Sequence, residues 1–118
     1  MAELIYKICT RAEWDTALKE GAYRGSTVDL ADGFIHFSTA AQARETAAKH
    51  FAGQADLLLI GVDPTKLPAA ALKWEPSRGG DLFPHLYDTL NTDAAISMVA
   101  LPWSDATGHR FPDAFPDG

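Results

Sequence analysis

Apolar stretches alternate with polar ones along the chain and predict a series of β-strands. The densest is "LLLIGV", residues 57–62, inside a strand predicted over 56–63 that is apolar enough to be buried on both faces. The other apolar stretches are rich in β-branched and aromatic residues and are bounded by turn residues, which is typical of strands. They span residues 4–9, 34–38, 72–75 and 95–103.

Two helices are predicted by capping boxes, in which Ser or Thr is followed three residues later by Glu or Gln. The two pairs are Thr10 with Glu13 and Thr39 with Gln42. The first predicts a helix that passes through Trp14 and stops at Gly21. The second predicts a helix over 40–51, with Ser38 as the competing cap.

The remaining segments are polar and rich in glycine and proline. Residues 23–33 are predicted to be a connecting loop, and residues 76–94 form the longest irregular stretch, a kind of segment that is usually functional in a compact domain. An ordered core over about 3–103 is followed by a surface tail, 104–118. The sequence predicts one α+β domain over 1–118, with a mixed or antiparallel sheet and two main helices.

Composition fits a compact domain and argues against a membrane protein. The chain has 118 residues, 47% hydrophobic and 22% charged, which are ordinary globular proportions. Its longest apolar run is far shorter than the ~20 residues that cross a bilayer. Glu3 stands where a secretory signal would need positive charge, so we expect a cytoplasmic protein that does not enter a membrane.

Charge and cysteine content limit the partners. The net charge is −6 and no two of the ten Lys and Arg residues are adjacent, which argues against binding to duplex nucleic acid and leaves a local pocket for a small ligand. Cys9 is the single cysteine and is predicted to be a small core residue, so no intramolecular disulfide forms. The sequence does not specify the oligomeric state.

The stretch "FIHFS", residues 34–38, places polar side chains inside an apolar strand. The alternation of a strand puts His36 and Ser38 on one face, roughly 6.6 Å apart, with Ile35 and Phe37 on the other. The helix that follows would present free backbone N–H groups beside them, an arrangement that favours an anion. The alternative is a core histidine bonded to a backbone carbonyl, with Ser38 and Thr39 acting only as caps.

A second motif, "FPHLY" at residues 83–87, places His85 and Tyr87 on one side of an extended segment. Each needs a hydrogen-bond partner when buried, and a half-exposed histidine with a backbone-bonded tyrosine is the structural alternative. Two histidine motifs in one small domain favour a shared cleft, in which histidine can act as base or acid near neutral pH.

Other candidate residues carry weaker signals. Glu75 could hold a ribose hydroxyl or orient a histidine, and Arg78 could contact phosphate, although both are also typical of solvated surfaces. Lys7 lies in a strand expected to be central, where a buried lysine needs a partner. Zinc binding by His36, His85 and Glu75 would match no known ligand spacing, so no metal site is predicted.

Several of these stretches together resemble one known family. They are "IYKI", "EGAY", "GFIHFSTAAQ", "LIGVDPTKL", "LKWE" and "FPHLYDTL", in this order over residues 4–101. The chain is identified by them as a member of a bacterial family catalogued as domain of unknown function 952. That family is in turn similar to the ADP-ribosyltransferase-like fold, most closely to the RNA 2′-phosphotransferases, whose H-V-H-L-S strand matches "FIHFS".

The resemblance implies an ADP-ribosyltransferase-like fold and a site for NAD or an ADP-ribosyl group. His36 and Ser38 would lie in that cleft, and His85 and Tyr87 would form its opposite wall. One departure is Lys7, which stands where the superfamily usually has a ribose-contacting histidine. Lysine can bind phosphate but cannot reproduce the hydrogen-bond geometry of imidazole.

Three hypotheses follow. The first is a transferase of ADP-ribosyl or phosphoryl type, acting on NAD or a nucleotide-like phosphate compound. In it, His36, His85 and Tyr87 are the catalytic residues, and six others bind the ligand. These six are Lys7, Ser38, Thr39, Gln42, Glu75 and Arg78. The second is a non-catalytic module that binds a small molecule or nucleotide, which the Lys7 departure favours; the third is a protein-interaction domain that uses the C-terminal tail.

Overall fold

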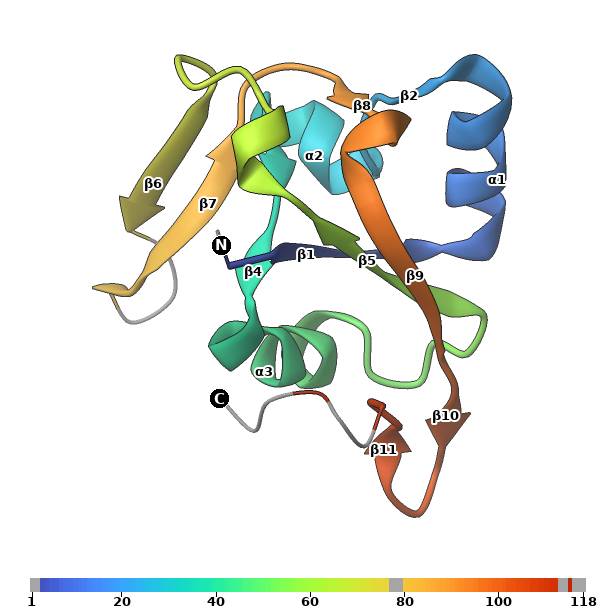
Figure 1. Cartoon of the computed structure of the whole chain (residues 1–118). Coiled ribbons are helices and arrows are strands. Elements are labelled where there is room, and N and C mark those ends of the chain that lie inside the picture. The colour runs from blue at the N-terminus through green and yellow to red at the C-terminus, as the bar shows by residue number, and fades with distance from the viewer. Residues whose placement is uncertain (1–2, 77–79, 113–114, 116–118) are drawn as a thin grey trace.

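A central four-stranded sheet forms the middle of the molecule (Figure 1). A computed structural model describes residues 3–76, 80–112 and 115. In it, the strands of the central sheet run in the order β4-β1-β5-β9, and each pairs antiparallel with its neighbour. They are β1 (Ile5–Thr10), β4 (Ser38–Thr39), β5 (Leu57–Val62) and β9 (Ala95–Leu101).

A second antiparallel sheet, in the order β3-β7-β6, adjoins the first. It consists of β3 (Ile35–His36), β7 (Leu82–Leu86) and β6 (Leu72–Pro76). The strand predicted over 34–38 is thus split into β3 and β4 at Phe37, whose backbone N–H donates to the carbonyl of Pro84 across 3.0 Å. The two sheets meet at this bend.

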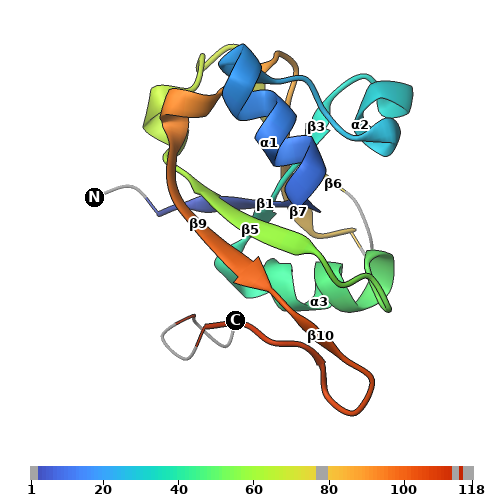
Figure 2. The ribbon, with the colours of Figure 1, turned by 90° about the vertical axis from the view of Figure 1, so that its right-hand side faces the viewer.

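Helices α1 (Arg11–Glu20) and α3 (Ala40–His50) cover opposite sides of the central sheet, as Figure 2 shows. Every residue of β5 is buried, as predicted, because both faces of that strand are covered. Leu58 and Ile60 pack in a cluster with Trp14, whereas Leu57 and Leu59 pack in a second cluster on the α3 side. Cys9 lies in the first cluster, so its predicted core role is confirmed, and burial raises the pKa of its thiol to about 12.

Both predicted capping boxes are present. The Thr10 hydroxyl accepts from the backbone N–H of Glu13, whose carboxylate accepts in return from the backbone N–H of Thr10. Helix α1 ends at Gly21, whose φ of 78° is a left-handed conformation that glycine adopts without strain. Thr39 and Gln42 make the same exchange at the start of α3, so Thr39 and not Ser38 is the cap.

The prediction of a loop over 23–33 was wrong, because this segment contains a third helix, α2 (Thr27–Asp32). A capping box between Ser26 and Asp29 begins it, and the left-handed Gly33 ends it. One six-residue helix among polar residues has too little apolar periodicity to be predicted from that pattern. The described residues therefore contain three α-helices in place of the two main helices predicted, and none of their helices is long and apolar enough to span a membrane.

Two further segments differ from the prediction. Residues 82–86 of the expected irregular stretch form β7, and β8 (Leu90–Asn91) pairs with β2 (Ala22–Tyr23). The beginning of the expected tail belongs to the fold, because β10 (Trp103–Ser104) and β11 (Gly108–His109) make a hairpin and Phe111 is buried on the α3 side. The first correction arises from pairing with segments outside that stretch, which local composition does not encode. The second arises from a local hairpin and from the packing of Phe111 against α3.

Candidate functional site

A cavity of about 380 Å³ lies between α2, α3 and the strands β1, β3 and β7, within the ~300–1,000 Å³ typical of small-molecule sites. The cavity forms where the pairing between β1 and β4 ends. Strand β4 pairs only with Ile5 and Tyr6 of β1, and the next two residues of β1, Lys7 and Ile8, line the cavity. Six titratable side chains line it. They are Lys7, Asp29, Asp32, His36, His50 and His85.

Asp29 connects helix α2 to two strands. Its Oδ2 lies 2.7 Å from Lys7 Nζ and accepts a hydrogen bond from the backbone N–H of Ser26 at 2.9 Å. Its Oδ1 lies 2.6 Å from His36 Nδ1 and accepts from the backbone N–H of His36 at 3.1 Å. The Asp29 carboxylate is therefore the partner that the buried Lys7 needs and that the sequence alone did not identify.

The environment of Asp29 keeps its carboxyl ionised. Burial by itself would raise the pKa of Asp29. The hydrogen bond from His36 and the positive charge of Lys7 outweigh burial, and the pKa lies well below its ordinary value. The site thus contains a fixed negative charge that is fully paired.

His36 is held between two carboxylates. Its Nδ1 faces Asp29, and its Nε2 lies 3.0 Å from Asp32 Oδ2, on the next turn of α2. Both ring nitrogens therefore face a carboxylate oxygen, and the orientation of the imidazole beside the cavity is fixed at both ends.

His85 lies directly across from His36, because β3 and β7 pair with these two residues opposite each other. Their ring centroids are 5.5 Å apart, and both rings line the cavity. The sequence prediction of a shared cleft agrees with this placement.

Glu75 orients His85 from the neighbouring strand β6. Its Oε1 lies 2.8 Å from His85 Nδ1 and accepts a hydrogen bond from the Tyr87 hydroxyl at 2.7 Å. The hydrogen bond from Tyr87 lowers the pKa of Glu75 most, and the bond with His85 lowers it further. The bond between Tyr87 and Glu75 also raises the pKa of Tyr87. When Nδ1 of a histidine donates to a carboxylate, Nε2 is the nitrogen left to accept or deliver a proton.

Tyr87 is placed differently from the prediction that it shares a wall with His85. Its ring lines an adjoining hollow of about 340 Å³ together with Phe34, while Asp29 lines both spaces. Phe34 stacks near His85 and Tyr87, with centroids at 4.2 and 5.1 Å. Tyr87 therefore does not line the histidine cavity and is linked to it through its bond to Glu75 and through the ring of Phe34.

The other predicted binding residues divide into two groups. Ser38 lines the cavity, where its hydroxyl lies 2.9 Å from that of Thr46. Thr39 and Gln42 do not line it, because their side chains form the α3 capping box and Gln42 also donates to the carbonyl of Leu82. The cavity lies along the side of α3 and not at its N-terminus. Arg78, the remaining predicted binding residue, lies outside the described residues.

Sequence reasoning missed Asp29, Asp32 and His50. Asp29 could have been found, because "STVD" at residues 26–29 repeats the capping-box spacing that identified the other two helices, with Asp at the third position. Asp32 follows from it at helical spacing. His50 carries no local signal, since only the packing of α3 brings it to the cavity.

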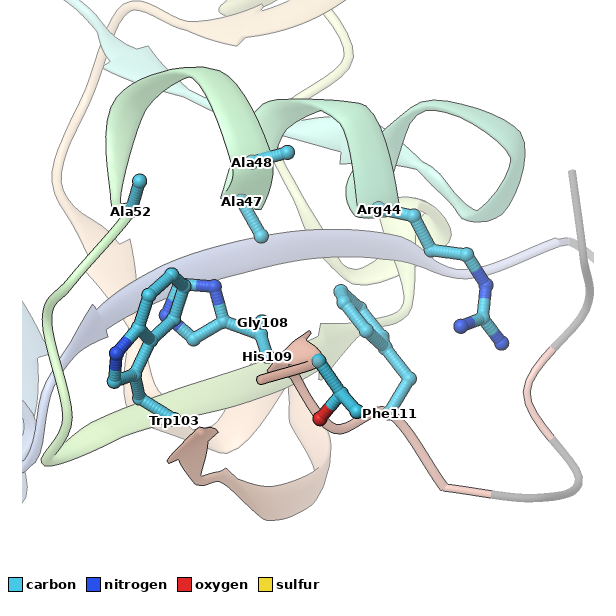
Figure 3. Close-up of a pocket in the computed structure, with 9 residues that line it drawn as sticks. Arg44, Ala47, Ala48, Ala52, Trp103, Gly108, His109 and Phe111 are labelled. Atoms are coloured by element: carbon cyan, nitrogen blue, oxygen red, sulfur yellow. The ribbon is translucent and has the colours of Figure 1, made fainter. Parts of the chain in front are cut away.

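A separate, largely apolar cavity of about 260 Å³ lies between α3 and the β10–β11 hairpin (Figure 3). His109 stacks against Trp103, with centroids 4.9 Å apart, and its Nε2 bonds to the carbonyl of Gln54. None of the predicted site residues lines this cavity. Within the described part of the chain, no group of three or more His, Cys, Asp or Glu side chains is arranged to hold a metal ion.

The fold and the cavity define a small α+β domain with two carboxylate-bound histidines in one cleft. The chain belongs to the family described as "Protein of unknown function (DUF952)", whose pattern matches residues 8–98. This confirms the family predicted from the motifs.

Solved structures of a relative share the fold of this chain. The crystal structure of protein CC0527 from Caulobacter crescentus is 50% identical, with a TM-score of 0.86, and the match covers 91% of this chain and 93% of that one. The solution NMR structure of CC0527 is 51% identical, with a TM-score of 0.77 and 90% of each chain covered. No curated protein matches the sequence.

Proposed function

We propose that the histidine cavity binds a nucleotide-like phosphate compound and catalyses ADP-ribosyl or phosphoryl transfer on it. The observation that carries this proposal is the pairing of His36 with His85, each bonded through Nδ1 to a carboxylate and both lining one cavity. Histidines oriented in this way are typical of general acid–base sites.

The two histidines have different roles in this proposal. His85 carries the proton, because Glu75 fixes its Nδ1 and leaves Nε2 for a ligand. His36, whose two ring nitrogens face Asp29 and Asp32, is a positioning residue that holds the wall of the cavity opposite His85 and so orients the phosphate or ribose end of the ligand. Transfer chemistry of this kind depends mainly on positioning and electrostatics, which suits a cavity without an activated nucleophile.

NAD and its ADP-ribose part are the first ligands to test, and the resemblance to the ADP-ribosyltransferase-like fold is part of the proposal. The cavity and the adjoining hollow share Asp29 and are separated by aromatic rings, on which a base could stack. Lys7 departs from the superfamily pattern and is paired with Asp29, so we assign it to holding α2 against β1 and not to contacting a ribose.

A non-catalytic ligand-binding module is the second candidate. The observation that favours it is the same ion pair, because Lys7 Nζ is 2.7 Å from Asp29 and the residue is only 4% exposed. A lysine held in this way contributes less to a reaction than a free one. Binding and turnover must therefore be measured separately.

The test is an NMR titration with NAD, ADP-ribose and AMP up to about 10 mM, which detects even the weak binding of a ~1 mM dissociation constant. We expect shifts at His36, Ser38 and His85, and product after long incubation, followed by phosphorus NMR. His85→Ala should abolish the product, whereas His109→Ala, a histidine in the other cavity, should not. Silence with all three compounds overturns the proposal, and shifts without product select the binding module.

A further inference from the structure

The two joined sheets have two outer strands, β6 at one end and β9 at the other. Among the described strands, β6 pairs only with β7 and β9 only with β5. An outer strand exposes unpaired backbone N–H and C=O groups that can pair with another chain. Figure 2 shows β9 in the foreground, with no helix or strand over its outer edge.

The two outer strands differ in how they are protected. Strand β6 contains Lys73, Glu75 and Pro76, and charges and proline are residues that prevent pairing between edges. Strand β9 is "AISMVAL" and has neither charge nor proline, although it is the longest strand in the described residues. Ile96 and Met98 are 52% and 50% exposed on it.

We propose that β9 is the interface of a homodimer, in which two copies of the chain pair antiparallel, edge to edge, about a two-fold axis at Met98. A second copy is the occupant that fits, because an antiparallel strand paired about its own middle is self-complementary. Each chain carries a net charge of −6, which by itself opposes association, but residues 94–104 contain no charged side chain, so pairing along β9 brings no like charges together. The isologous contact of a two-fold dimer needs such a self-complementary segment.

The register follows from the length of the strand. Met98 is the middle residue of Ala95–Leu101, so pairing about it sets Met98 against Met98 of the second copy and Ile96 against Ala100. These residues share one face of the strand and form an apolar row across the interface. Beyond the strand, Asp93 falls opposite Trp103, so no acidic pair is brought together.

The first experiment is sedimentation velocity on the full chain over a range of concentrations, with Met98→Lys as the test variant. We expect a monomer–dimer equilibrium that Met98→Lys weakens at least about tenfold, because it sets two like charges side by side on the axis. Leu30→Lys is the control: Leu30 is also exposed, at 66%, but lies on α2, and the variant should dimerise normally. A monomer at every concentration overturns the proposal, as does a dimer unaffected by Met98→Lys.

The second experiment tests the register independently of affinity. Met98→Cys should give a disulfide-linked dimer under mild oxidation with diamide, because directly opposed residues of an antiparallel pair approach to Cβ distances of ~4.5 Å, the upper end of the range that a disulfide bridges. The native Cys9 is 1% exposed and does not compete. Leu82→Cys, on β7, should give no disulfide-linked dimer, because that residue lies away from the β9 edge. Equal linkage in both variants would show random collision and would contradict the register.

Discussion

Lys7 and Asp29 form an ion pair whose side chains are 5% and 2% exposed, with Nζ 2.7 Å from Oδ2. Removing water from both charges costs more than an isolated pair regains, so such a pair needs further hydrogen bonds. Asp29 receives them from His36 and from the backbone of Ser26. The pair therefore fixes α2 to β1 and orients a histidine of the candidate site.

Asp29→Asn should destabilise the fold by about 3–5 kcal/mol, because it leaves Lys7 buried without a counter-charge. The measurement is urea unfolding at neutral pH. Asp56→Asn is the matched control: Asp56 pairs with Arg11 at the surface, with exposures of 77% and 47%, and should cost about 1 kcal/mol or less. Equal losses in the two variants would contradict the role assigned to Asp29.

Lys7→Met should cost less than Asp29→Asn, because the carboxylate keeps its bonds to His36 and to the Ser26 backbone. In Asp29→Asn the lysine ammonium keeps the ring of Tyr23, 5.9 Å from its Nζ, but has lost its counter-charge. The same urea experiment compares them. If Lys7→Met were the more damaging change, the lysine would be the organising charge of the site.

Stability should fall as the pH drops below about 4, near the ordinary pKa of an aspartate. The folded pKa of Asp29 is lowered, so folding is stabilised by its ionised form above the unfolded pKa, and this contribution is lost as the pH falls toward the folded pKa. Urea unfolding at pH 7, 5, 4 and 3 measures it. In Asp29→Asn the loss between pH 5 and 3 should be smaller than in the unchanged protein; parallel curves would contradict the prediction.

The capping boxes of α1 and α2 allow an effect on ligand binding to be separated from an effect on stability. Ser26→Ala and Thr10→Ala should each cost about 1 kcal/mol, because each removes a helix cap. Only Ser26→Ala should weaken binding of a ligand in the histidine cavity, since α2 carries Asp29 into that cavity and α1 does not line it. Similar affinities for the two variants would show that α2 does not organise the site.

The local signals predicted much of the fold, and the pairing of distant segments decided the rest. Thr10, Thr39 and Gly21 act where the sequence placed them, because caps depend on neighbours within four residues. The contact between His36 and His85 depends on the register of β3 with β7, which no local pattern specifies. The role of Lys7 was likewise hidden until α2 brought Asp29 to it.

The hydroxyl of Tyr87 acts on the site through Glu75, and this link can be tested by removing one oxygen atom. Tyr87→Phe should raise the pKa of Glu75 toward the ordinary value, because the hydrogen bond from Tyr87 is the largest cause that lowers it. A carbon-13 NMR titration of the Glu75 carboxyl measures the change, and Tyr6→Phe, on β1, should leave it unaltered. If the proposed transfer activity exists, the pH profile of turnover should move with that pKa, since Glu75 also holds His85. A Glu75 pKa that is the same in Tyr87→Phe and the unchanged protein would mean that the hydroxyl does not donate to Glu75, and the proposed effect of this hydroxyl on His85 would be overturned.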